Sequence, residues 1–300
     1  MSENILLSLC IPTNGVSEWL FPVLDSIYEG TKDTSGFEVI VTDNGNDEQF
    51  GIRMNEYCKC HENLIYRKTE AVQFLNQIEA FKLANGKMIK FVNHRQTLLP
   101  GAIEYLIDFV EKNEANKPAV FFMNGSQKGK NGLAVYSDFD SYVKGLGVMS
   151  SWSAGTTMWK TDFEKMDLEK SFNHLFPHTD MVFADKEKTQ YIIDHTVLFK
   201  EIEVDDTKKG KYNLFNAFAI EYVSIILDLY RNGYISKETF LDVKKENAQF
   251  VAQLYYKYLI RKQPCSYDLS GFDESVKFFY SKKEIYKAMF TVIRKTIMGK

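Results

Sequence analysis

The chain has 300 residues, 45% of them hydrophobic and 26% charged, which is typical of a globular protein with a large buried core. Its net charge of −3 creates no overall positive field, so we expect no nucleic-acid partner. The four cysteines are too few for a disulfide framework, which favours a cytoplasmic protein with reduced thiols. No apolar run reaches the roughly 18 residues of a membrane span, so we expect any membrane contact to be peripheral.

The first part of the chain alternates strands with helices. Short apolar runs predict strands at 5–11, 37–42, 64–67, 88–92 and 119–123. Apolar residues at helical spacing predict helices after the first, third and fourth of these strands. The helix-marking residues are Leu20, Val23, Leu24 and Ile27, then Phe74, Ile78 and Phe81, then Ile103, Leu106, Ile107 and Val110. This alternation predicts an α/β fold with a mostly parallel sheet flanked by helices.

The second part of the chain changes character. Glycines are frequent between residues 124 and 205, and a lysine-rich segment at 208–211 resembles a boundary. From residue 213 onward the pattern is helical. Asn232-Gly233 predicts a helix end, Ser236 a helix start, and Ser281 with Glu284 a capping box. We therefore expect a domain at 1–210 and an all-helical C-terminal region at 211–300.

Polar residues follow three of the predicted strands. The first strand ends in Pro12-Thr13-Asn14, the second in Asp43-Asn44, and the fourth in Asn93-His94-Arg95-Gln96. Carboxyl ends of parallel strands meet at one edge of a sheet, and ligands bind in the crevice outside that edge. These segments therefore predict a shared binding crevice.

Four segments together resemble the family 2 glycosyltransferases of the GT-A fold. The resemblance covers residues 4–112 well and 150–200 faintly, and the group it most resembles is the abequosyltransferase-like enzymes of bacterial surface polysaccharides. The matching segments are Leu7-Ser8-Leu9-Cys10-Ile11-Pro12-Thr13-Asn14, the run from Phe37 to Asp47, the positions Asn76, Ala80, Ala84 and Gly86-Lys87, and Leu98-Leu99-Pro100-Gly101-Ala102.

The resemblance implies roles by position for the residues of the crevice. Pro12, Thr13, Asn14 and Asn44 would line the nucleotide of a nucleotide-sugar donor. Asp43 would accept hydrogen bonds from the pyrimidine or ribose, a role that suits a carboxylate because it only accepts. The alternative for Asp43 is an aspartate that caps its own turn.

The chain departs from the family where an acidic motif is expected, since His94-Arg95-Gln96 stands there. The family's carboxylates hold a divalent metal against the diphosphate, and a hard cation lacks good ligands in this loop. Three interpretations follow. Arg95 contacts the diphosphate itself, since a guanidinium matches phosphate oxygens; His94 binds a softer metal; or the chain no longer transfers sugar. The Cys58-Lys59-Cys60-His61 segment fits no common zinc spacing, so we assign no metal site.

An inverting transfer needs a general base for the acceptor hydroxyl. By position, the resemblance points to Asp180, and His178 is the nearby alternative because of its suitable intrinsic pKa. The same segment could instead simply cap a helix.

The last predicted helix is basic and amphipathic. Its apolar stripe comprises Ile285, Met289, Val292, Ile293 and Ile297, among the cations Lys277, Lys282, Lys283, Lys287, Arg294, Lys295 and Lys300. Such a helix can lie on an anionic bilayer, or it can dock its stripe on the protein core.

These features predict a glycosyltransferase that moves a sugar from a nucleotide-diphosphate donor to a bacterial surface-glycan or lipid-linked acceptor. The resemblance implies that the transfer is inverting. We predict no cofactor beyond the nucleotide-sugar substrate, and we expect the protein to lie in the cytoplasm or on the inner face of the membrane. The alternative is a catalytically degenerate GT-A-fold protein that binds glycans or assists assembly.

Overall fold

The computed structural model describes residues 5–31, 33–168, 172–203 and 205–297. The chain divides into two compact units. One combines Met1–Asp138 with Trp152–Glu203, and the other combines Phe139–Ser151 with Val204–Lys300. The second unit therefore joins the C-terminal helices to the helical segment Phe139–Ser151. The domain boundary at residue 210 stays a prediction.

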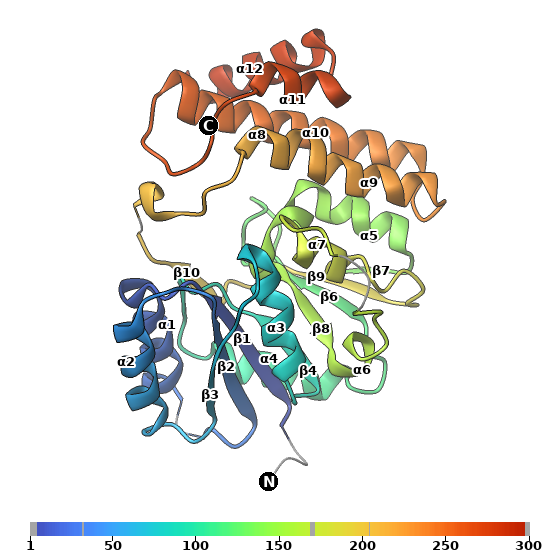
Figure 1. Ribbon diagram of the computed structural model, residues 1–300. Helices are drawn as coiled ribbons and strands as arrows, with labels where there is room; N and C mark the ends of the chain where they lie inside the picture. The colour runs from blue at the N-terminus through green and yellow to red at the C-terminus, as the bar shows by residue number, and fades with distance from the viewer. Residues whose placement is uncertain (1–4, 32, 169–171, 204, 298–300) are drawn as a thin grey trace. The chain divides into compact units, whose positions relative to one another are not determined.

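The first unit is built on a mostly parallel sheet, as the sequence predicts (Figure 1). The strand order is β3-β2-β1-β4-β8, and only β8 runs antiparallel to its neighbour. These strands are β1 (Leu7–Thr13), β2 (Phe37–Asp43), β3 (Leu64–Lys68), β4 (Met88–Phe91) and β8 (Thr157–Trp159).

Two smaller sheets extend this layer. The order β6-β9-β7 comprises β6 (Ala119–Phe122), β9 (Tyr191–Asp194) and β7 (Leu133–Tyr136). An antiparallel bridge between Phe121 and Thr156 joins β6 to the start of β8, so β6 and β9 run in the same direction as β4. β5 (Gln96–Leu98) pairs antiparallel with β10 (Phe199–Glu201) directly after the β4 loop.

Helices cover both faces of the main sheet (Figure 1). Alternate residues of a strand point to opposite faces, so Leu9 and Val39 pack against α1, α2 and α4, while Cys10 and Ile40 pack against α3, α6 and α7. The bounds are α1 (Ser17–Glu29), α2 (Glu48–Cys58), α3 (Asn76–Leu83, after the 3₁₀ turn η1 at Gln73–Leu75), α4 (Ala102–Asn113), η3 (Ser153–Gly155), α6 (Lys160–Phe163) and α7 (Pro177–Val182).

The five predicted strands are all present, each within two residues of its predicted ends. Helix α2 was not predicted, because it buries only Phe50 and Met54 and so shows a weak apolar stripe. Its start is nevertheless well defined, since the Asp47 side chain accepts hydrogen bonds from two backbone N–H groups. The loop after β4 is shorter than expected, because β5 interrupts it before Gly101 caps α4.

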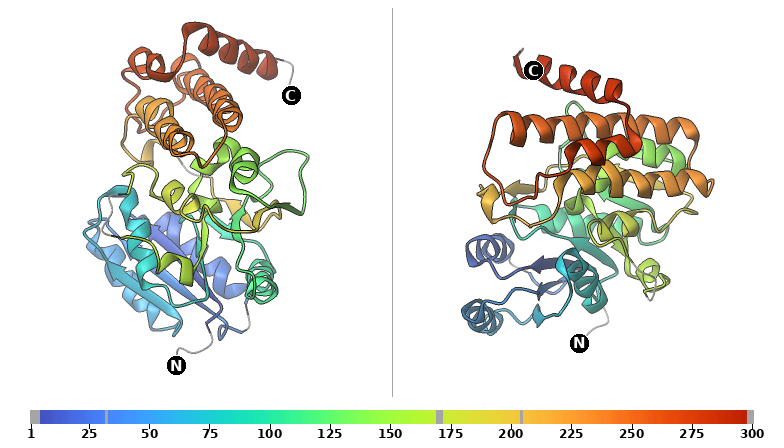
Figure 2. Two further views of the ribbon diagram at one scale, coloured as in Figure 1. Left: turned by 90° about the vertical axis from the view of Figure 1, so that its right-hand side faces the viewer. Right: turned by 45° about the horizontal axis from the view of Figure 1, so that its top comes forward.

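The second unit is helical, and its core joins Phe215, Val223, Val251, Val276 and Ile285. Helix α10 contacts α9 and α12 (Figure 2). The capping box at Ser281 is present: the Ser281 hydroxyl accepts from Glu284 N, and Glu284 Oε2 accepts from Ser281 N at 2.8 Å. The elements are α5 (Phe139–Leu146), η2 (Gly147–Ser151), η4 (Asp206–Lys208), α8 (Leu214–Asn216), η5 (Ala217–Glu221), α9 (Tyr222–Arg231), α10 (Lys237–Tyr255), η6 (Tyr256–Ile260), α11 (Phe272–Phe279) and α12 (Lys282–Ile297).

Among the helices of the described ranges, none combines the length and the apolar character that crossing a bilayer requires.

Candidate functional site

The carboxyl ends of four parallel strands meet at one edge of the main sheet. The register pairs Thr13 of β1 with Asp43 of β2, and Asp43 with Lys68 of β3. On the other side of β1, the backbone N–H of Val92 donates to Cys10 O at 2.8 Å, which places the segment after β4 beside Thr13. The edge therefore gathers residues that are far apart in the sequence.

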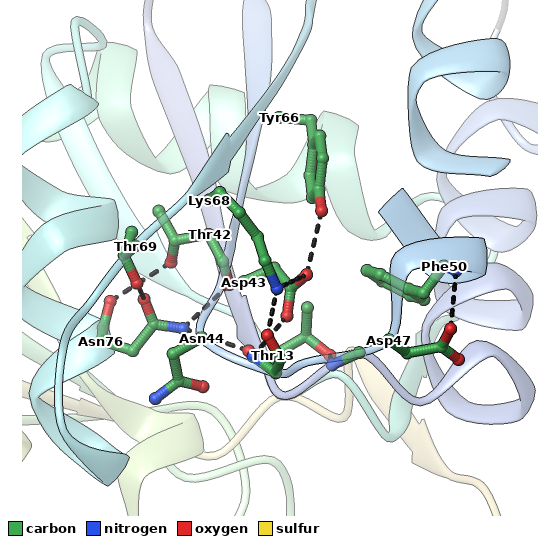
Figure 3. A network of polar contacts seen from close by, with 12 residues as sticks. Thr13, Thr42, Asp43, Asn44, Asp47, Phe50, Tyr66, Lys68, Thr69 and Asn76 are labelled. Atoms are coloured by element: carbon green, nitrogen blue, oxygen red, sulfur yellow. Dashed lines mark hydrogen bonds and ion pairs between the residues drawn. The ribbon is translucent and has the colours of Figure 1, made fainter. Parts of the chain in front are cut away.

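Asp43 is fully buried at the centre of this edge (Figure 3). Its Oδ1 accepts from Gly45 N at 2.7 Å, and its Oδ2 accepts from the Tyr66 hydroxyl and the Lys68 ammonium, both at 2.9 Å. Burying a carboxylate is costly unless it is paired, and Lys68 neutralises this one. The turn interaction that the sequence suggested for Asp43 is therefore present, and a ligand would have to share or replace these donors.

The Asn44-Gly45 turn lies against the β1 loop. A Cβ atom on Gly45 would lie 2.1 Å from Asn14 O, so only glycine permits this close approach. The Asn44 amide points the other way and donates to Ala71 O and Gln73 O, at 2.8 and 3.0 Å. Asn44 thus ties two loops together, while Asn14 beside it is exposed.

Asn76, at the start of α3, joins the strand ends from the other face (Figure 3). Its amide donates to Thr13 O at 3.2 Å and to Thr42 O at 2.9 Å, and its carbonyl accepts from the Thr69 hydroxyl at 2.8 Å. Asn76 therefore links the ends of β1 and β2 to the segment after β3.

His94 contacts β1 through its ring. Its Nδ1 lies 2.9 Å from the Thr13 hydroxyl oxygen, and its ring meets Trp19 edge-on at 5.1 Å between centroids. Burial, and secondarily the neighbouring Arg95 charge, lowers the pKa of His94 to about 3. A neutral imidazole shapes this crevice without adding positive charge at physiological pH.

Arg95 is the cation of the loop. Its backbone N–H and its Nε both donate to Asn93 Oδ1, at 3.1 and 3.3 Å. Its guanidinium carbon lies 5.4 Å from the centroid of the Trp19 ring, within cation–π range. The next residue, Gln96, begins β5 and donates from its amide to Glu201 at 3.2 Å. Arg95 is thus held from two sides and half-buried.

The donor set of this loop does not fit a divalent metal. Throughout the described ranges, no group of three His, Cys, Asp or Glu side chains is placed to hold a metal ion. Asn93 Oδ1 already accepts two bonds from Arg95, and the guanidinium itself repels a second cation.

The two candidate bases lie on another element, α7, which packs against α3 through Met181 (Figure 1). Asp180 is half-buried, and its Oδ2 accepts from Asn173 N at 2.6 Å. His178 is buried and packs edge-on against Phe176. The structure thus brings together five of the predicted site residues: Thr13, Asp43, Asn44, His94 and Arg95. Pro12 is half-buried and Asn14 exposed beside them. Asp180 and His178 lie on a different element, α7.

Tyr66, Lys68, Trp19 and Asn76 complete the edge. The sequence pattern gave no indication of a role for the first three. Tyr66 and Lys68 sit at the end of β3, and the order β3-β2-β1-β4 is what brings them to Asp43. The sequence held one signal for Tyr66 and Lys68: they lie at the end of the predicted strand at 64–67, which follows directly after the strand that carries Asp43.

The described cavities lie away from this edge. One of about 770 Å³ lies at the amino edge of the sheet, between Leu6, Gly36 and the α4 residues Glu104, Asp108 and Glu111. Another of about 700 Å³ lies beside Tyr136 and Gln190.

Comparison with solved structures identifies the fold. The chain is similar to S. aureus TarS 1-349, with a TM-score of 0.60 and 12% identity over 99% of this chain and 92% of that one. For TarS 1-349 in complex with UDP-GlcNAc, the TM-score is 0.56 at 12% identity, covering 95% and 79%. A further structure of S. aureus TarS matches with a TM-score of 0.52 and 13% identity over 85% of this chain, which spans 44% of that chain.

No protein-family model matches the chain, and no curated protein matches it. The structural likeness nevertheless places the molecule in the class of GT-A-like folds, with a mostly parallel sheet flanked by helices and a C-terminal helical region.

Proposed function

We propose that this chain is a glycosyltransferase that moves a hexosyl or deoxyhexosyl group from a nucleotide-diphosphate donor to a bacterial surface-glycan or lipid-linked acceptor. The observation that carries the proposal is the crevice edge of a GT-A-like sheet, where Thr13, Asp43 and Arg95 converge. A related fold, TarS 1-349, was crystallised with UDP-GlcNAc, so UDP-sugars are the first donors to test.

Arg95 stabilises the leaving diphosphate in this proposal. Its fork of N–H donors matches phosphate oxygens, and Asn93 and Trp19 hold it in place before the donor arrives. The neutral His94 orients the Thr13 hydroxyl beside it. Lys68 lies at the rim with half of its side chain exposed, and its charge is paired with that of Asp43.

The nucleotide would lie along Pro12, Thr13, Asn14 and Asn44. Asp43 acts indirectly, by holding Tyr66 and Lys68 at the rim, because its carboxylate is fully buried and already accepts from three donors. Direct contact with the base would require one of these donors to move.

Asp180 is the proposed general base. It would remove the proton of the acceptor hydroxyl while that oxygen bonds to the anomeric carbon and the bond to the diphosphate breaks, which inverts the configuration. Its Oδ2 accepts from Asn173 N at 2.6 Å, and this contact orients the carboxylate.

Calorimetric titration of UDP, UDP-GlcNAc and other nucleoside diphosphates, with and without EDTA, tests the donor site. Binding that survives EDTA and weakens about 10- to 100-fold in Arg95→Ala supports it, as expected for the loss of a charge-assisted contact of about 1.5–3 kcal/mol. Arg53→Ala is the matched control, because that guanidinium also lies on an aromatic ring, 3.8 Å from the centroid of Phe21, but on α2. Absence of binding by any nucleotide contradicts the proposal.

Donor turnover tests the base. Asp180→Asn keeps an oxygen for the Asn173 N–H and removes only the basicity, so donor binding should persist while turnover falls about 100-fold or more. Unchanged turnover removes this assignment, and loss of turnover in His178→Gln alone transfers it to His178.

The second candidate is a catalytically degenerate GT-A-fold protein that binds glycans. The observation that favours it is the absence of a metal-ligand cluster in the described ranges. Nucleotide or glycan binding with no turnover of any nucleotide-sugar would establish it. In either case we propose that the protein works in the cytoplasm, at the inner face of the membrane that carries its glycan.

A further inference from the structure

Helix α12 packs most of its predicted apolar stripe against the protein core, as one of the two alternatives for this helix predicted. Ile285, Ala288 and Val292 are buried, and Met289 is partly buried, against the core of the second unit. Most of the stripe that the sequence offered to a bilayer is therefore occupied by packing. The Ile297 and Lys295 side chains and the whole of Lys300 lie outside the described residues.

A second apolar face of α12 is exposed. Tyr286, Phe290 and Ile293 expose 67%, 69% and 39% of their surface. At 3.6 residues per turn, the three fall within about 60° of one another around the helix axis, on the side away from Ile285 and Val292. Neighbouring exposed apolar side chains of this size form a patch, and such patches mark interaction sites more often than single exposed residues do.

Cations border this exposed face. Lys283, Lys287 and Arg294 lie about 60–100° to one side of Tyr286, and all three are exposed. None forms an ion pair with a described residue. The helix's one acidic residue, Glu284, is instead paired with Lys244 at 3.1 Å. The face therefore presents unneutralised positive charge beside aromatic rings.

We infer that this face of α12, formed by Tyr286, Phe290, Ile293, Lys283, Lys287 and Arg294, binds an anionic lipid surface. Aromatic rings lie at the boundary between headgroups and acyl chains, while lysine and arginine beside them pair with anionic headgroups. A protein partner would have to supply both acidic groups and an apolar surface at the same spacing. The inference deepens the proposed function by naming the surface that meets a lipid-linked acceptor.

Vesicle binding by the full chain tests this face. Phosphatidylcholine vesicles containing phosphatidylglycerol should bind the protein, pure phosphatidylcholine vesicles should not, and salt should weaken the binding. Replacing Lys283, Lys287 and Arg294 together by Gln should weaken it about 100-fold. The matched control replaces three exposed cations elsewhere, Lys128, Lys200 and Arg231, by Gln and should bind as the native protein does.

Two further measurements separate insertion from simple charge attraction. In Phe290→Trp, the tryptophan fluorescence should shift to the blue when anionic vesicles are added. Phe290→Ser should weaken binding. Leu241→Ser should not, because this exposed apolar residue lies on α10 and outside the proposed face.

Equal binding to neutral vesicles, full binding by the triple Gln variant, or no binding at all would overturn the inference. So would a dimer in solution that Phe290→Ser converts to a monomer, because the face would then meet a second copy. Donor titration needs no vesicles, so failure of the lipid surface and failure of the proposed sugar transfer are distinguishable.

Discussion

A buried lysine, Lys90, should make the free energy of unfolding depend on pH. Its side chain is fully buried in β4, the strand that leads to the Arg95 loop, and no acidic side chain of the described ranges pairs with it. Its ammonium donates to Phe91 O at 2.9 Å and to Ala154 O, and lies 5.5 Å from the centroid of the Phe122 ring. Burial lowers the pKa of Lys90 from 10.5 to about 7.

The sign of the pH dependence follows from this lowered pKa. Between pH 7 and about 10.5, the folded state holds a neutral amine while the unfolded state still holds the proton. The unfolded state then binds more protons, so raising the pH stabilises the fold. Each unit is worth about 1.4 kcal/mol, which sums to about 5 kcal/mol across the window as an upper value.

Urea unfolding at pH 7, 8, 9 and 10 measures this effect, and Lys90→Met is the reference. The methionine keeps most of the side-chain volume and cannot titrate, so shifts from tyrosines and cysteines cancel in the difference. The native chain should gain about 1.4 kcal/mol per pH unit over the variant. A constant difference across the four pH values would refute the reasoning, because Lys90 would then be charged in its carbonyl cage.

Two further predictions concern the crevice. Gly45→Ala should weaken nucleotide binding and lower the midpoint of thermal unfolding, because the new Cβ would lie 2.1 Å from Asn14 O. Gly30→Ala is the control, since the nearest atom to its new Cβ is 3.4 Å away. Equal effects of the two substitutions would contradict the assignment. His94 should remain neutral from pH 5.5 to 8, since its pKa is lowered to about 3, so calorimetric nucleotide affinity should show no His94-dependent change there. A pH step that disappears in His94→Gln would contradict the second prediction.

The sheet was predictable because its strands are buried on both faces. Such strands read as continuous apolar runs, and their order along the chain already indicates a parallel sheet. The polar carboxyl edge of the sheet was predictable for the same reason, because parallel strands all end at the same edge. Pairing partners were not predictable: Tyr66 and Lys68 reach Asp43 only through the β2–β3 register, which the sequence does not specify.

The last helix shows a different limit. Ile285, Val292 and Phe290 are all apolar, and periodicity alone does not say whether the protein core or another surface covers a given stripe. The structure assigns Ile285 and Val292 to the core and leaves Phe290 exposed. Docking on the protein core therefore describes the side of α12 that carries Ile285 and Val292. Lipid binding is proposed only for the opposite side, which carries Phe290.

The organisation of the β4 loop bears on whether the site has lost its activity. A loop released from function has no reason to fix a cation in place. Here Asn93 accepts two hydrogen bonds from Arg95, Trp19 lies beneath its guanidinium, and His94 contacts the Thr13 hydroxyl. Holding a long side chain this way costs conformational entropy, which a leaving diphosphate would offset by binding it. These contacts favour a fixed cation that replaces a metal over the remains of a lost acidic motif, and Arg95→Ala distinguishes the two.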